Sequence, residues 1–493
     1  MSRAIKQQFA IALLALSVAG CANYSGLNTS ATGIDANELQ AQKSFNDVKV
    51  SAVAWPKPDW WKSLGDAQLN GLIDEALKDS PDLQLAQARA HQASAAAYAV
   101  DASRMPEINA QAGVERARLA RDQDPLGEGG RYSTLRTAAI DFNYNFDLWG
   151  GQRAAWEAAL GQARAAEVDQ KAAQLTVAAD VARAYNNLGA AHAVHDLAVE
   201  DLKRTSQMVS LSKRRMDAGI DSIYQYQQSE SLAASSKEQL LASEKDLQSA
   251  KIALAVVLGK GPDRGQQIAR PATLQASAVA LPSQLPAELL GRRPDIVAAR
   301  WRVEAASKNI DASKTRFYPN LNLSASGGVQ SLLGDAMFGN ASRFFSIAPT
   351  VSLPLFDGGR LRADLDARDA DYDLAVAQYN KSLVQALGQV SDTINQLRAI
   401  GQQIREQTRA AEIAQSSYDT VADRFGSGIG NYLDVLSIEQ QLLGAQRQLA
   451  NLNAEQINLS ILLMEALGGG FQPDTTPLNA DTTNASATAA QTE

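Results

Sequence analysis

The sequence has very few residues that could bind a metal or form a disulfide. Its 493 residues include one cysteine, Cys21, and three histidines, His91, His192 and His195. A single cysteine excludes a disulfide within the chain. His192 and His195 are three residues apart on a predicted helix, but without a nearby cysteine a solvated helix surface explains them better than a metal site. We therefore expect no metal, no cofactor and no enzymatic activity.

The sequence also has no excess of basic residues. Acidic residues outnumber basic ones, 54 to 46, and the formal net charge is −8. Nucleic acid binding requires a basic face, and no run of Lys and Arg supplies one, so this class of partner is excluded. The glycine-rich run from Gly127 to Gly130 lacks a lysine and the strand-to-helix setting of a phosphate-binding loop. We interpret it as the loop of a hairpin.

Long apolar runs are absent as well. The stretch from Phe9 to Ala19 is apolar but too short for a membrane-spanning helix. It follows Arg3 and Lys6 and leads into Val18-Ala19-Gly20-Cys21, which is the pattern of a lipoprotein signal peptide. A lone exported thiol would be an exposed liability, whereas acylation of Cys21 removes it. Residues 1–20 are therefore predicted to be a signal peptide.

The predicted mature chain begins at the acylated Cys21. Ala22 follows it, where an inner-membrane retention signal would usually place aspartate. We expect a protein of the outer membrane of a Gram-negative bacterium, anchored by lipid at its N-terminus and extending into the periplasm. Residues 21–60 are predicted to form a lipidated, extended segment, because the sequence there is mostly polar and weakly patterned.

The most informative feature that is present is an internal duplication. Four pairs of similar positions are each 209 residues apart: Leu188 and Leu397, Arg215 and Arg424, Gly219 and Gly428, and Leu258-Gly259 and Leu467-Gly468. A constant offset over so long a span indicates two copies of one unit. We assign the halves to residues 61–260 and 287–470, with a connector at 261–286 and a disordered tail at 471–493.

Each half contains a predicted β-hairpin, at 107–147 and at 320–356. Apolar and polar residues alternate there with the two-residue period of a strand. The alternation predicts that one face is apolar, with Phe142, Tyr144, Val351 and Leu353, and that the other is polar, with Asp141, Asn143 and Asn145.

A soluble sandwich and a transmembrane barrel both fit this alternation. The signal peptide, and the lack of any other segment long enough to span, favour the barrel, with the apolar face toward lipid and the polar face toward a wet lumen. Four strands cannot close a barrel, and open edges in lipid leave unpaired backbone groups at a cost of several kcal/mol each. The barrel must then be shared among chains.

Two stretches have the period of an α-helix over roughly 65 to 70 residues without proline, which corresponds to about 100 Å. Such helices need neighbours along their whole length, as in a coiled coil. They are predicted to end near Gly219 and Gly428, which suit left-handed C-caps. Antiparallel helices then return at about 224–258 and 432–467, so the sequence predicts two helical hairpins with exposed tips.

These features resemble the TolC-type outer-membrane efflux proteins, in their lipoprotein (OprM-like, NodT) branch, over nearly the whole mature chain. The motifs that carry the resemblance are the lipobox at Cys21, Trp60-Trp61 with Leu64-Gly65, Arg292-Arg293-Pro294-Asp295, Phe317-Tyr318-Pro319, Phe356-Asp357-Gly358-Gly359-Arg360 and Leu467-Gly468-Gly469-Gly470. The resemblance implies a mixed α and β fold and a homotrimer. Its 12-stranded transmembrane β-barrel, with four strands from each chain, would continue into a periplasmic α-helical barrel.

The resemblance also implies partners and site residues. In relatives the tips close the tunnel and receive a periplasmic adaptor, which links it to an inner-membrane resistance-nodulation-division transporter. The adaptor-contact tips would be Gly219, Ile220, Asp221, Gly428, Ile429 and Gly430, and the periplasmic gate would be Phe425, Leu433 and Asp434. Some relatives lock this aperture with an ion pair, whereas this chain has Ser437 and Gln440 there.

The function implied is that of the outer-membrane channel of a tripartite efflux pump, which exports small molecules such as antibiotics. The alternative within the channel class is the exit duct of a type I protein secretion system, which uses the same architecture. A periplasmic coiled-coil scaffold without a pore would explain the long helices, but it leaves the four alternating strands without a role.

Overall fold

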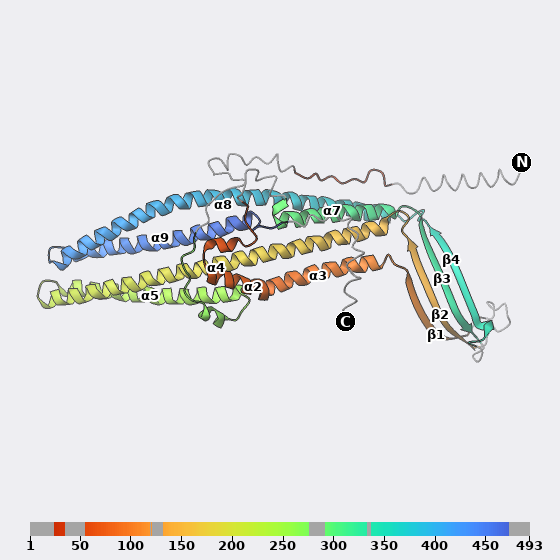
Figure 1. The fold of residues 1–493 in the computed structure, drawn as a ribbon, viewed down its shortest axis with the longest axis horizontal. Coiled ribbons are helices and arrows are strands. Elements are labelled where there is room, and N and C mark those ends of the chain that lie inside the picture. The colour runs from red at the N-terminus through yellow and green to blue at the C-terminus, as the bar shows by residue number, and fades with distance from the viewer. Residues whose placement is uncertain are drawn as a thin grey trace.

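The computed structural model describes residues 24–34, 55–118, 120, 132–275, 291–332 and 337–472. The molecule is elongated (Figure 1). Four strands lie at one end, and helices run from the sheet to two helical hairpin tips at the opposite end (Figure 1). The predicted signal peptide, Cys21 and the predicted tail beyond Gln472 lie outside the described residues.

The order of the elements repeats from one half to the other. The first half contains η3 (Trp60–Leu64), α2 (Ala67–Asp79), α3 (Pro81–Ala102), β1 (Glu107–Arg118), β2 (Tyr132–Phe146), α4 (Gly151–Asp217), α5 (Ile223–Val257) and η5 (Pro262–Gln267). The second contains α7 (Pro294–Thr315), β3 (Asn320–Ser331), η6 (Asn340–Ser342), β4 (Arg343–Ser352), α8 (Arg360–Gly426) and α9 (Tyr432–Ala466). The two long helices have 67 residues each and the two returning helices 35 each. These bounds confirm the predicted duplication in the part of the chain that is described.

The four strands form one antiparallel sheet in the order β1-β2-β3-β4. Directly paired residues point to the same face of a sheet. One row across the sheet is Ile108, Phe142, Ala325 and Ile347, and the adjacent row is Asn109, Asp141, Ser326 and Ser346. The register therefore sorts apolar and polar side chains onto opposite faces across all four strands, as predicted.

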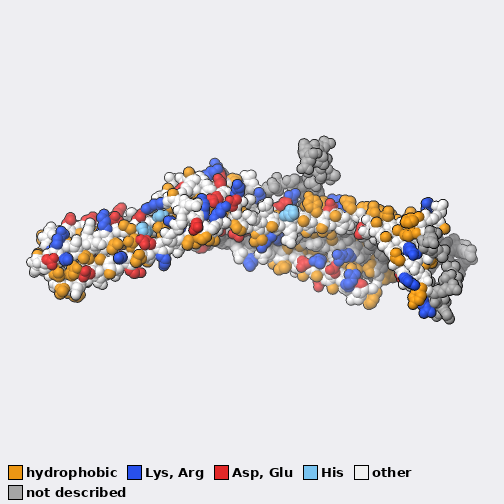
Figure 2. All heavy atoms as spheres, turned by 90° about the horizontal axis from the view of Figure 1, so that it is seen from below, with side chains coloured by type: hydrophobic (Ala, Val, Ile, Leu, Met, Phe, Trp, Pro, Cys, Tyr) orange, Lys and Arg blue, Asp and Glu red, His pale blue; other side chains and the backbone are white. Residues whose placement is uncertain are grey.

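The apolar face is open to the surroundings in the single chain. Ile108 is 67% exposed, Phe345 85% and Ile347 69%. In the space-filling view hydrophobic side chains gather around the sheet end, whereas acidic and basic side chains are interspersed along the helices (Figure 2). One predicted strand residue is corrected: Leu353 lies just beyond the end of β4 at Ser352, where the alternation no longer continues as a strand. None of the helices in the described ranges is both long and apolar enough to cross a membrane.

Both long helices begin next to the sheet, and they begin in the same way. Gly150 and Gly359 precede α4 and α8 with φ of 75° and 89°, a left-handed conformation that favours glycine. The carboxylate of Asp147 accepts hydrogen bonds from the first turn of α4, from the backbone N–H groups of Gln152 and Arg153. The carboxylate of Asp357 accepts equivalent bonds from Gly359 and Leu361. The Phe-Asp motif that opens each copy is therefore a helix cap.

Helix α4 is packed against five other helices, α2, α3, α5, α7 and α9. Small residues allow this close packing. A methyl group on Gly161 of α4 would lie 3.0 Å from the Cβ of Ala305 on α7. On α5, Ser229, Ser236 and Ser243 recur every seven residues and are all buried. Helix α4, the alanine-rich first copy of the long helix, therefore has neighbours on most of its sides.

The main hydrophobic core lies midway along the molecule and joins the two halves. It contains Tyr185 and Leu188 of α4 together with Ile461 of α9. The connector after α5 contributes to this core, because Ile268 and Leu274 are buried in it. The described part of the predicted connector, 261–275, is therefore packed structure and not only a link between the halves.

Candidate functional site

The two hairpin tips are built by the same backbone contacts. After α4, Gly219 has φ of 72° and the N–H of Ile220 donates to the carbonyl of Arg215 at 2.8 Å. After α8, Gly428 has φ of 82° and the N–H of Ile429 donates to the carbonyl of Arg424 at 3.0 Å. These bonds satisfy the last carbonyls of each long helix, which explains why a glycine is required at both positions.

Exposed isoleucines occupy both tips. Ile220 is 65% exposed and Ile429 is 74% exposed, and Gly219 and Gly428 beside them are also exposed. The first tip continues with Ile223 and Tyr224, exposed by 65% and 66%. Each tip therefore presents apolar side chains at the far end of the molecule from the sheet.

Two other predicted tip residues lie toward the interior of the tips. The Asp221 carboxylate forms an ion pair with Arg215 at 2.9 Å, and its side chain is only 4% exposed. Gly430 is half-buried, and a Cβ there would lie 2.9 Å from the backbone nitrogen of Phe425. Asp221 and Gly430 were predicted to be adaptor-contact residues at exposed tips. At these two positions the tips are not fully exposed, and the residues shape the tips from inside.

The predicted gate residues separate into two groups. Leu433 is 52% exposed, and Asp434 is exposed beside it. Ser437 and Gln440 follow on the same helix and are exposed too. Phe425 is instead buried, with only 1% of its surface exposed. The prediction that its side chain narrows a pore is corrected, because in this conformation the ring is enclosed within one chain.

Phe425 packs between the two hairpins. Its ring lies beside that of Tyr432 with centroids 5.9 Å apart, and Met208 of α4 and Val435 of α9 complete the cluster. Arg215 covers it from the first hairpin, with its guanidinium carbon 4.6 Å from the ring centroid and its Nη1 donating to the Phe425 carbonyl at 3.3 Å. Apolar and cation–π contacts therefore hold the tips of the two hairpins together.

A buried group of charges lies next to this apolar cluster, farther from the tips. Asp201 and Arg204 come from α4, and Glu439 comes from α9. Asp201 and Glu439 are each 3% exposed, and Arg204 Nε is 3.8 Å from Glu439 Oε1. Burial, and then the charge of Asp201, raise the pKa of Glu439 to about 7, although Arg204 acts in the opposite direction. This group was not predicted from the sequence.

Several sequence motifs meet at a second location, midway along the molecule. Arg293 Nη1 donates to the carbonyl of Ala466 at 2.8 Å, and the same guanidinium binds both oxygens of Asp295. The glycine motif after α9 passes through this junction with three left-handed residues, Gly468, Gly469 and Gly470. A Cβ on Gly468 would lie 1.9 Å from the carbonyl oxygen of Arg292. The motifs thus hold the second half's helices together.

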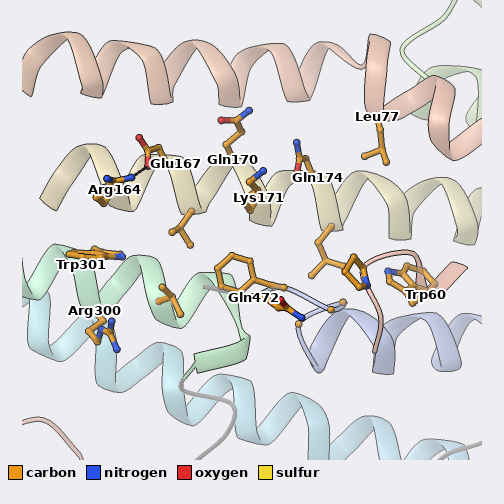
Figure 3. Close-up of a pocket in the computed structure, with 18 of the residues that line it drawn as sticks. Trp60, Leu77, Arg164, Glu167, Gln170, Lys171, Gln174, Arg300, Trp301 and Gln472 are labelled. Carbon is orange, nitrogen blue, oxygen red and sulfur yellow. Dashed lines mark hydrogen bonds and ion pairs between the residues drawn. The ribbon is translucent and has the colours of Figure 1, made fainter. Parts of the chain in front are cut away.

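A cavity of about 770 Å³ lies beside this junction, between α4 and α7 (Figure 3). Trp60 and Trp301 line it with apolar surface, and Arg164 and Lys171 of α4 and Arg300 of α7 bring positive charge. The ion pair between Arg164 and Glu167 is drawn in the close-up (Figure 3). Among the described residues, no group of three or more His, Cys, Asp or Glu side chains could hold a metal ion.

The N-terminal segment that is described, residues 24–34, runs along α8. The hydroxyl groups of Tyr24 and Tyr318 are 3.3 Å apart near the base of the sheet. Farther along, the backbone N–H groups of Ser30 and Ala31 donate to Asp373, and that of Ile34 donates to Asn380. This segment was predicted to be extended, and in the structure its backbone N–H groups donate hydrogen bonds to side chains of α8.

The family model described as "Outer membrane efflux protein" matches residues 72–260 and 285–469, one segment in each half. The chain belongs to the outer membrane efflux protein family. It is 36% identical to the fusaric acid resistance protein FusA of Burkholderia cepacia over 75% of this chain and 71% of that protein. It is 31% identical to the pyoverdine export outer membrane protein OpmQ of Pseudomonas aeruginosa, over 84% and 88% of the two chains.

The fold matches that of a solved outer membrane protein. The outer membrane protein VceC of Vibrio cholerae superposes with a TM-score of 0.79 at 36% identity, over 85% of this chain and 100% of that one. Family membership, the two-faced sheet and the long helical hairpins agree on one function. The protein is the outer-membrane channel of a tripartite efflux pump in a Gram-negative bacterium, and its family is one of transport proteins.

One signal in the sequence could have indicated the buried charges of this efflux channel. The inward face of α9 is formed by Tyr432, Val435, Glu439 and Leu442, which recur at intervals of three and four residues. A glutamate in such a stripe occupies a position that the period assigns to an apolar residue. Its partners Asp201 and Arg204 lie on α4, more than 200 residues earlier, and only the packing of the helices brings them to it.

Proposed function

We propose that three copies of this chain form the channel and share one 12-stranded barrel. The observation that carries the proposal is the sheet, which has an apolar and a polar face and ends in strands, β1 and β4, whose outer edges are unpaired within the described chain. Unpaired edges are not tolerated in lipid. Pairing of β4 from one chain with β1 of the next satisfies both edges and closes the barrel with its polar face inside.

The helices support the same arrangement. Within one chain α4 and α7 are flanked on both sides, whereas α3 and α8 lie at the outer sides of the helical layer. A neighbouring chain would cover these helices as it pairs the strands. The long hairpins would then surround a tunnel that continues from the barrel into the periplasm.

The tips are proposed to contact a periplasmic adaptor through Gly219, Ile220, Gly428 and Ile429, with Asp221 and Gly430 shaping them from inside. The exposed isoleucines suit a partner that contributes apolar surface. The adaptor would link the channel to an inner-membrane resistance-nodulation-division transporter. Leu433 and Asp434 are proposed to line the closed end of the tunnel, and small organic molecules such as antibiotics are the proposed cargo.

The N-terminal anchor is part of the proposal. Tyr24 is placed against Tyr318 near the base of the sheet, at the level where the barrel would enter the periplasmic leaflet. Cys21, three residues earlier, would then be close enough to that leaflet for its acyl chains to insert. Acylation adds about 0.8 kcal/mol for each methylene group buried in lipid.

Two measurements on the protein extracted from membranes test the proposal. Native mass spectrometry should give three chains, each with a lipid-modified Cys21 at its N-terminus, and the same sample should form ion-conducting pores in planar bilayers. A monomer without conductance would refute the shared barrel. An unmodified N-terminus at another residue would refute the anchor alone, because the barrel does not depend on it.

A further inference from the structure

The buried charges between the hairpins do not balance. Two carboxylates, Asp201 and Glu439, are each 3% exposed, and one guanidinium, that of Arg204, lies beside Glu439. The distance of 3.8 Å from Arg204 Nε to Glu439 Oε1 is too long for a hydrogen bond. Arg204 Nε and Nη2 and Glu439 Oε1 are buried without a hydrogen-bond partner among the described residues. Burying two acids against one base is costly when both acids are ionised.

Within the described part of the chain, no second base acts on Glu439. On α4 the charged groups that act on it are Asp201 and Arg204. On α8 its neighbour is Tyr418, which Arg204 covers with its guanidinium carbon 5.6 Å from the ring centroid. On α9 it is Tyr432, whose buried hydroxyl also has no partner among the described residues. A proton on Glu439 would remove the excess negative charge.

The group also lies where it can control movement. Arg204 and Asp201 belong to the first hairpin and Glu439 to the second, and α4 packs directly on α9. Next to it, toward the tips, the apolar cluster of Phe425 and Met208 joins the same two hairpins. If the hairpins separated, water would reach Glu439, and its carboxylate would no longer be held close to that of Asp201.

We propose that Asp201, Arg204 and Glu439 form a proton-dependent clamp that holds the two hairpins of each chain together when Glu439 is protonated and loosens when it is ionised. This inference deepens the proposed function, since it rests on an opening of the tunnel by movement of the hairpins. It assigns regulation by proton uptake to a position distinct from the exposed residues Leu433 and Asp434.

The direction follows from the two states of Glu439. Its pKa is about 7 in the packed arrangement and the ordinary value is 4.5. The packed arrangement therefore holds more protons than the separated one between these values, and raising the pH favours separation. The effect can reach at most roughly tenfold in the ratio of separated to packed hairpins per pH unit. Below about pH 4.5 the acid is protonated in both arrangements, and this dependence ends.

Distance measurements test the clamp independently of conduction. Spin labels would be placed on two exposed sites, Lys203→Cys on α4 and Gln441→Cys on α9, in a Cys21→Ser background. The separated population should grow between pH 5 and pH 7, in the full-length protein reconstituted in lipid. Glu439→Gln should abolish this change and keep the hairpins packed, whereas Glu412→Gln, an exposed acid on α8, should leave it unaltered. A pH response that survives in Glu439→Gln would overturn the clamp.

A second variant keeps the test valid if Glu439→Gln fails to assemble. Asp201→Asn leaves Arg204 to Glu439 alone and removes the acid that raises its pKa, so the pKa of Glu439 should differ less between the packed and separated arrangements. The growth of the separated population between pH 5 and pH 7 should therefore be smaller than in the wild type, and a change as large as that of the wild type would overturn the clamp. Open probability in planar bilayers, recorded over the same pH range, then separates the two proposals. A distance change without a change in open probability supports the clamp and refutes its link to the gate.

Discussion

The guanidinium of Arg215 lies over the ring of Phe425, with its central carbon 4.6 Å from the ring centroid, and so joins the tips of the two duplicated hairpins within one chain. The same guanidinium is held in place by Asp221, whose carboxylate it binds at 2.9 Å and 3.1 Å. Both side chains are largely buried, 13% and 4% exposed. One arginine thus fixes the first tip internally and binds it to the second.

Arg215→Gln should loosen this contact. It removes the cation–π interaction and leaves the Asp221 carboxylate buried without its partner, which should destabilise the packed tips by about 3 kcal/mol. Higher conductance of the purified channel in planar bilayers would report the loosening. Arg214→Gln is the matched control, because Arg214 is the exposed neighbour on the same turn. Equal conductance of the two variants would contradict the role of Arg215.

The sequence allowed the long elements to be predicted because their periodicity extends over many turns and occurs twice. The constant offset of 209 residues located both long helices, and α4 and α8 do begin and end 209 residues apart. The strands were predicted from the alternation of apolar and polar residues. The end of β4 at Ser352 could not be predicted in this way. Leu353 is apolar and lies two positions after Val351, so the alternating pattern continues past the point where the strand ends.

The inward positions of Phe425 and Asp221 could not be predicted from the sequence. An apolar residue beside a hairpin tip can equally face a pore or pack against the other hairpin, and its partners Met208 and Arg215 are more than 200 residues away. Asp221 is different, because its partner Arg215 is only six residues away, but an aspartate in a turn is usually solvated and no local pattern distinguishes one that is buried in an ion pair. Contacts between the halves depend on how the helices pack, which a local period does not encode.

The two faces of the sheet predict opposite responses to a charge. Phe142 and Asn143 are adjacent on β2, and the register places Phe142 in the apolar row with Ile108 and Ile347. Phe142→Arg should cost about 2 to 4 kcal/mol if the site is near the bilayer midplane, and less near its edge, whereas Asn143→Arg faces the wet lumen. Heat dissociation of the lipid-reconstituted protein measures this. Greater damage from Asn143→Arg would mean that the faces are reversed.

The glycine motif after α9 should tolerate no side chain at its first position. Gly468→Ala would force a left-handed residue to carry a Cβ, at about 1 to 2 kcal/mol, and would drive that Cβ against the Arg292 carbonyl at 1.9 Å. The apparent Tm should fall clearly. Gly444→Ala on α9 is the control, because a Cβ there meets nothing within 4 Å and alanine stabilises a helix by up to about 1 kcal/mol. Equal Tm values for the two variants would contradict the packing role of the motif.

The last prediction concerns the exposed residues of the second hairpin. Leu433 is 52% exposed in the single chain, and neither Ser437 nor Gln440 on the same face can form an ion pair. If three copies of Leu433 meet at the axis, the tunnel is closed by apolar contact, and such a gate opens when the contact is removed. Leu433→Ala should then raise single-channel conductance and sensitise cells to large antibiotics. Asp434→Asn should chiefly lower the preference for cations, because it removes a negative charge at the mouth. Tyr224→Ala changes the equivalent exposed position of the first hairpin and should leave conductance near the wild-type value. If Leu433→Ala assembles correctly and conducts like the wild type, Leu433 does not close the tunnel.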